Sequence, residues 1–272
     1  MKREKALEIL REAGIKAEEG SALKNGRRIP SIIVGEGLIR PTLYQHHIEN
    51  IEDADELIKF VKEVITERPE VNPSEFYSKE YVLENVISCI RHETDDDETL
   101  KFRVYGDLEE YFRVSLGNQS EGMMSIVITK SIAANLNLDI DEVRMSARRN
   151  LSKTVSIRGM SEVLANMLNI ESSQLPLPEE EMMYVATANG GIEGASVMLL
   201  SDVLDEFCET HGVEKLIIIP SSTEEILLVP ECPEDESSIN SIIQEVNETQ
   251  IPDESKRLSD HLYYYDKKIT EY

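Results

Sequence analysis

Tryptophan is absent from the sequence, phenylalanine occurs only five times and cysteine only three times. Cys89, Cys208 and Cys232 are far apart and show no CxxC or CxxH spacing. An odd number of widely separated cysteines argues against a disulfide scaffold and against a zinc site. Cys89 and Cys208 fall at apolar positions of expected helices, where a cysteine is usually a small buried residue. We therefore expect a reduced protein without a metal site.

Long apolar runs are also missing. No window approaches the roughly 20 apolar residues that a membrane-spanning helix needs. The first twenty residues carry charges throughout and lack the unbroken apolar core of a signal peptide. These absences predict a soluble, cytoplasmic protein with no membrane partner.

Positive charge is scarce, because 28 basic residues face 53 acidic ones and the net charge is −25. The excess is concentrated in residues 51–100, at −10, and 201–272, at −13, whereas residues 1–50 carry +2. Binding to a phosphate backbone needs a positive surface, so direct nucleic-acid binding is not expected. A strongly acidic surface instead favours a basic protein as partner.

Apolar periodicity and capping residues predict several helices and strands before residue 171. Asp139 and Ser161 are predicted helix caps, and His46 and His47 are expected on a strand, pointing to opposite faces. Helices are predicted for residues 3–13, 53–68, 78–91, 140–150 and 162–168, and strands for 29–34, 37–44, 101–108, 111–116 and 125–129.

The segment SSQLPLPEEE (172–181) is a polar break that contains two prolines. It is the best predicted boundary between an N-terminal α/β lobe (1–171) and a C-terminal lobe (182–272), although a long loop is the alternative. The C-terminal pattern reads β-α-β-β-α-β and predicts a compact lobe with a mostly antiparallel sheet. Its first helix is expected over 194–212 and its second over 237–249. The predicted fold class is α+β.

Ser221 and Ser222 lie between two apolar runs, in IIIPSSTEEILLV. A serine nucleophile needs a base within reach, and neither a GxSxG elbow nor an SxxK motif is present. Proline followed by small polar residues is ordinary turn chemistry. The turn interpretation is therefore favoured over a catalytic one. Asp260 and His261 are treated alike, because the side chains of sequence neighbours diverge and a turn before the YYY strand explains them better.

Two features of the sequence are of a kind that can bind an anion. Asn189 begins a glycine-rich segment, NGGIEG, at a strand-to-helix junction, but it matches no nucleotide-binding motif and is explained as a tight turn. Arg148 and Arg144 share one helix face, four residues apart. Cations near the end of a helix usually complement its dipole, and a phosphate or a partner's carboxylate is the alternative. No cofactor motif is present.

Six motifs occur along the chain in a recognisable order: PTLYQHHIEN, SARRN, YVATANGGIEGASVMLL, IIPSSTEEILLVP, EVNETQ and LSDHLYYYD. Together they resemble a bacterial family, domain of unknown function 5688, over nearly the whole chain, and the last four are the specific ones. The YVATANGG to LLVP region is also similar to domain of unknown function 1444. The resemblance implies an intracellular bacterial protein, with a possible link to mobile elements, and carries over no functional residue.

The matching motifs fall mostly at turns, at Pro220–Ser222, Asn247–Gln250 and Ser259–His261, and their convergence on one surface is the predicted functional site. The leading hypothesis is an acidic protein that binds a macromolecule, in one version by mimicking nucleic acid. One alternative is an enzyme of unassigned class that uses Ser221, Ser222, Asp260 and His261. The other is a small-anion sensor that uses Asn189 and the arginines.

Overall fold

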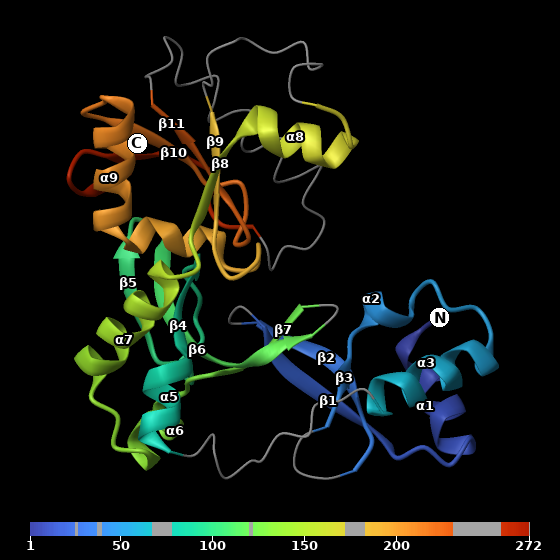
Figure 1. Ribbon diagram of the computed structural model, residues 1–272. Coiled ribbons are helices and arrows are strands. Elements are labelled where there is room, and N and C mark those ends of the chain that lie inside the picture. The colour runs from blue at the N-terminus through green and yellow to red at the C-terminus, as the bar shows by residue number, and fades with distance from the viewer. Residues whose placement is uncertain are drawn as a thin grey trace. The chain divides into compact units, whose positions relative to one another are not determined.

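The computed structural model contains both helices and antiparallel sheets, which confirms the predicted α+β class (Figure 1). It describes residues 1–24, 27–36, 40–66, 78–119, 122–171, 183–230 and 257–271. The contacts divide the chain into two compact units, Met1–Ser78 and Lys79–Tyr272. Among the described helices, none combines the length and the apolar character needed to cross a bilayer.

The described residues of the first unit form a three-stranded antiparallel sheet in the order β1-β2-β3, accompanied by three helices. Its elements are α1 (Arg3–Glu12), β1 (Ala17–Lys24), β2 (Arg27–Val34), β3 (Thr42–Leu43), α2 (Gln45–Ile48) and α3 (Ala54–Thr66). Leu10, Ile32 and Leu57 share its core. The helices predicted at 3–13 and 53–68 are confirmed. His46 and His47 lie on α2, so the predicted strand position is wrong for both.

The second unit begins with a four-stranded antiparallel sheet in which β6 pairs with β4, β5 and β7. Its elements are α5 (Lys79–Asn85), β4 (Val86–His92), β5 (Lys101–Tyr105), β6 (Leu108–Gln119), β7 (Gly122–Val127), α6 (Lys130–Asn135) and α7 (Ile140–Ser152). Asp139 caps α7 as predicted, since its side chain accepts a hydrogen bond from the Glu142 amide at 2.9 Å.

The helix predicted over 78–91 is wrong in its second half, because it ends at Asn85 and continues as β4. Six consecutive residues, Val86–Arg91, are buried. A strand buried on both faces has no alternating pattern, so periodicity does not separate it from a buried helix. Cys89 therefore lies on a strand, whereas Cys208 lies on a helix as predicted. Burial raises the pKa of both thiols, which leaves them protonated and unreactive.

A six-stranded antiparallel sheet completes the second unit, in the order β13-β12-β10-β11-β9-β8. Its elements are β8 (Ser156–Gly159), α8 (Met160–Leu168), β9 (Tyr184–Thr187), the 3₁₀ helix η2 (Gly194–Leu199), α9 (Ser201–His211), β10 (Leu216–Ile219), β11 (Ile226–Val229), β12 (Tyr263–Tyr265) and β13 (Ile269–Glu271). The helix predicted over 194–212 thus has two parts. Ser161 lies inside α8, and the cap is Gly159, so that predicted cap is wrong. The helix predicted at 237–249 lies outside the described residues.

The observed division after Ser78 differs from the boundary predicted at 172–181, a segment that lies outside the described residues. Residues from before and after that segment share one hydrophobic core, in which Ile90 and Leu108 pack with Leu204. The Ile90 amide also donates a hydrogen bond to Ser196 Oγ at 3.0 Å. A polar stretch of sequence does not by itself tell whether its two flanks pack together.

Gly194 allows two backbone segments to approach closely. Its amide donates to the carbonyl oxygen of Glu224 at 3.0 Å, and the amide of Ala195 donates to that of Thr223 at 3.2 Å. A Cβ atom at position 194 would lie 2.1 Å from the Glu224 oxygen, which is too close for any side chain. The loop before β11 is therefore fastened to the start of η2.

We expect Gly194→Ala to lower the free energy of unfolding by about 1–3 kcal/mol, because the backbone around Glu224 must shift. Gly190→Ala is the control. A Cβ there meets no atom within 4 Å, and the cost of its positive φ of 72° is about 1 kcal/mol. Urea denaturation measures both. A smaller loss for Gly194→Ala than for Gly190→Ala would contradict the close approach.

Candidate functional site

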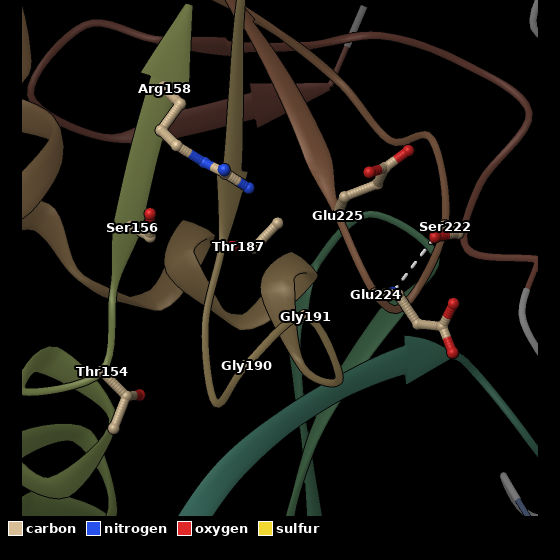
Figure 2. Close-up of a pocket in the computed structure, with 9 residues that line it drawn as sticks. All are labelled: Thr154, Ser156, Arg158, Thr187, Gly190, Gly191, Ser222, Glu224 and Glu225. Atoms are coloured by element: carbon tan, nitrogen blue, oxygen red, sulfur yellow. Dashed lines mark hydrogen bonds between the residues drawn. The ribbon is translucent and has the colours of Figure 1, made fainter. Parts of the chain in front are cut away.

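A pocket of about 600 Å³ lies in the second unit, beside β8 and the loop before β11 (Figure 2). Three segments line it: Thr154, Ser156 and Arg158; Thr187, Gly190 and Gly191; and Ser222, Glu224 and Glu225. The pocket therefore brings the turn after Asn189 together with the Ser222 loop. These are two of the segments that the sequence predicted as binding elements.

Strand register places the first wall of the pocket. β8 pairs with β9 so that Ser156 lies opposite Thr187, and Arg158 lies two residues further along β8. Side chains two residues apart on a strand point to the same face. Ser156 and Arg158 therefore both face the pocket, and Figure 2 shows the Arg158 side chain reaching into it.

The turn from Asn189 to Gly191 forms the floor, and it has the conformation of a tight turn. Its φ angles are 51°, 72° and 93°, in the left-handed region that asparagine and glycine tolerate best. The Ala188 carbonyl oxygen accepts from the Gly191 amide at 3.0 Å, and the Asn189 amide donates to Thr154 Oγ1 at 3.2 Å. The Asn189 side-chain nitrogen is buried and has no hydrogen-bond partner among the residues that the structure describes.

Ser221 and Ser222 serve the loop that forms the opposite wall. Ser221 Oγ donates to Glu225 Oε1 at 3.2 Å, and Ser222 Oγ accepts from the Glu224 amide at 3.1 Å. The Ser222 amide donates to the Glu225 carbonyl oxygen at 3.1 Å. These are the bonds of a turn, as the sequence favoured, and neither hydroxyl bonds to an imidazole of the described part of the chain.

Arg148 and Arg144 bind an internal carboxylate, that of Glu110. Glu110 Oε2 lies 2.8 Å from Arg148 Nη2 and 3.0 Å from Arg144 Nε. Ser88 Oγ donates to the same carboxylate at 2.8 Å, and the Glu110 side chain is fully buried. Glu110 thus supplies the anion for both guanidinium groups.

Sequence reasoning missed this buried carboxylate and two more. Glu109 accepts from Arg91 at 2.6 Å and pairs with Lys101 at 2.9 Å. Glu193 pairs with Arg113 at 2.7 Å. Burial raises the pKa of the Glu193 carboxyl, and the nearby Arg113 charge opposes that rise. The available signal was the acidic pair in GDLEEYFRV, which interrupts an otherwise strand-like run.

His261 lies in a second polar cluster, around Asp107. Its Nε2 is 3.5 Å from Asp107 Oδ1, and His92 Nδ1 is 3.1 Å from Asp107 Oδ2. Ser259 Oγ donates directly to Asp107 Oδ2 at 3.1 Å, and the Tyr263 hydroxyl donates to Asp107 and, at 3.0 Å, to Ser259.

This arrangement anchors the chain rather than activating a nucleophile. A reactive serine needs the imidazole between hydroxyl and carboxylate. Here Ser259 Oγ lies 3.4 Å from both ring nitrogens of His261, and it lies closer, at 3.1 Å, to the Asp107 carboxylate, to which the buried hydroxyl donates directly. Asp260 is exposed and next to this cluster. The third predicted loop, 247–250, lies outside the described residues. Within the described part of the chain, no group of three or more histidine, cysteine and acidic side chains is arranged to hold a metal ion.

We expect Glu110→Ala to lower the free energy of unfolding by about 3–5 kcal/mol, because two partly buried guanidinium groups lose their counter-ion. Glu206→Ala, at an exposed position of α9, is the matched control and should cost less than about 0.5 kcal/mol. Urea denaturation followed by circular dichroism compares them. Similar denaturation midpoints for the two variants would mean that the pairing of Glu110 with Arg144 and Arg148 contributes little to the stability of the fold.

We expect Asp107→Ala to loosen β12, because Ser259 and Tyr263 lose their shared acceptor. The measurement is hydrogen exchange of the Tyr263–Tyr265 amides, which should speed up several-fold. Asp95→Ala, in an exposed loop, serves as control. Unchanged protection of these amides in the Asp107 variant would show that the cluster is not an anchor.

Comparison with known proteins bears on the whole chain. The chain matches no curated protein and no solved structure. The model of a family described as a family of unknown function (DUF5688) matches residues 21–267. Since this match covers nearly the entire sequence, as the six motifs predicted, the chain belongs to the DUF5688 family.

Proposed function

We propose that this protein acts by binding a basic protein through carboxylates on its second unit. The net charge supports this, because residues 79–272 contain 16 basic and 38 acidic residues, for a net charge of −22. Residues 1–78 carry only −3. A charge imbalance of this size raises the local concentration of cationic partners and repels anionic ones.

The observation that carries the proposal is that basic side chains of the second unit form ion pairs with its own buried carboxylates. Four nearly buried carboxylates take up five basic side chains, in the pairs formed by Arg91, Lys101, Arg113, Arg144 and Arg148 with Asp96, Glu109, Glu193 and Glu110. The rest of this unit then has 11 basic residues against 34 acidic ones. Outside these pairs, acidic residues therefore outnumber basic ones by 34 to 11, a higher ratio than the 38 to 16 of the whole unit.

Two exposed groups of carboxylates offer contact points. One is the loop between β4 and β5, with Asp95 and Asp97, and the other is the outer side of α9, with Glu206 and Glu209. No ion pair joins these four side chains to the described residues. They are therefore available to lysine and arginine side chains of a partner. In the nucleic-acid-mimic version of the proposal, the partner's own ligand is DNA or RNA.

The test is a pull-down with the full chain from a lysate of the source organism. We expect a stoichiometric partner with an excess of lysine and arginine, released as salt rises through roughly 0.3 M, where the Debye length falls below about 6 Å. In the mimic version, added DNA also displaces the partner. A fourfold variant should retain less than about a tenth of the bound partner. Its substitutions are Asp95→Asn, Asp97→Asn, Glu206→Gln and Glu209→Gln.

The matched control removes four exposed carboxylates from the first unit instead: Glu49, Glu52, Asp55 and Glu56, changed to their amides. This control should bind like the native chain. Absence of a stoichiometric partner at low salt, an acidic partner, or equal loss in both variants would each contradict the proposal.

A further inference from the structure

We propose that the pocket between β8 and the loop before β11 binds a small zwitterionic ligand, of the amino acid and dipeptide class. This site is independent of the acidic surface proposed above. The carboxylate of the ligand would bind Arg158, and its ammonium group would bind Glu225, which lines the pocket from the loop before β11 (Figure 2).

The size of the pocket suits such a ligand. Pockets for small molecules usually measure about 300–1,000 Å³, and this one measures about 600 Å³. Hydroxyl and charged groups dominate its lining, whereas pockets for apolar ligands have aromatic and aliphatic walls. The lining therefore favours a ligand that is polar over most of its surface.

Arg158 supplies the positive wall. Its side chain is exposed, reaches into the pocket and forms no ion pair with any described residue. This sets it apart from Arg144 and Arg148, which are committed to Glu110. A guanidinium group presents two parallel N–H donors that match a carboxylate. Ser156 and Thr187 also line the pocket, and neither hydroxyl forms a hydrogen bond with a described side chain. Both hydroxyl groups can therefore bind the ligand.

Glu225 supplies the negative wall. Its carboxylate accepts one hydrogen bond, from Ser221, and has no cationic partner among the described residues. An ammonium group of the ligand would give this carboxylate a partner of opposite charge. A purely anionic ligand such as phosphate gains Arg158 but is repelled by Glu225, so the second wall separates a zwitterion from an anion.

The backbone keeps the two walls apart. The pairing of β8 with β9 fixes Arg158, and the hydrogen bonds from Gly194 and Ala195 fix the loop that carries Glu224 and Glu225. The pocket is thus preformed, which lowers the entropic cost of binding. Arg158 and Glu225 do not form an ion pair across the pocket, so a ligand with opposite charges at its two ends can contact both side chains.

Thermal shift and calorimetry on the full chain test the assignment with a panel of the free amino acids and of alanine-containing dipeptides. We expect at least one member to raise the melting midpoint, whereas its N-acetylated and its C-amidated forms bind about tenfold more weakly or worse. Inorganic phosphate should cause no shift. A panel without any binder overturns the proposal.

Variants locate the site. Arg158→Gln and Glu225→Gln should each weaken the best ligand by about tenfold or more. Arg103→Gln and Glu214→Gln, at exposed positions outside the pocket, should leave binding unchanged. All four positions lie at the surface or are half-buried, and circular dichroism checks that the variants fold. Binding that survives both pocket variants, or that depends on Arg158 while phosphate competes equally well, contradicts a zwitterion site.

Discussion

The carboxylate of Glu110 is the interaction on which the second unit depends. It lies fully buried in β6 and receives two guanidinium groups from α7 and a hydroxyl from β4, so it fixes the helix against the sheet by charge as well as by apolar packing. Glu109, its neighbour, points to the opposite face of β6 and holds Arg91 and Lys101 there. Burying charges costs several kcal/mol per ion unless they are paired. The two acidic residues therefore require all four of these basic partners.

This requirement shapes the surface. Each basic side chain that pairs with a buried carboxylate has its charge compensated inside the unit, so the ratio of acidic to basic residues is higher among the residues outside these pairs. The proposed basic partner follows from that physical consequence rather than from any catalytic arrangement. The polar clusters that resemble reaction centres, around Ser221 and around Ser259, use their hydroxyl groups to hold a loop and a strand in place.

The pocket beside β8 departs from this pattern, because Arg158 and Glu225 form no ion pair with each other. Arg158 and Glu225 face one pocket from separate segments, and backbone hydrogen bonds hold these segments in place. Gly194 makes this possible, since only a residue without a Cβ permits the approach to the Glu224 carbonyl. Gly194 belongs to the glycine-rich segment that the sequence offered as an anion-binding turn, but its role is in backbone packing. The charged side chains of the pocket come from other segments, Arg158 from β8 and Glu225 from the loop before β11.

The sequence by itself determined the α+β class, the helices α1, α3 and α7 with the Asp139 cap, and the turn at Ser221 and Ser222, because these depend on local periodicity and on short-range hydrogen bonds. It misassigned Val86–His92, since a strand buried on both faces and a buried helix share one apolar pattern. Only the tertiary structure decided that Glu110 is buried between Arg144 and Arg148, and that Arg158 shares a pocket with Glu225. Those partners are 34 or more residues apart in the chain. The strength of a charge pair depends on distance and burial, and both quantities exist only once the chain has folded.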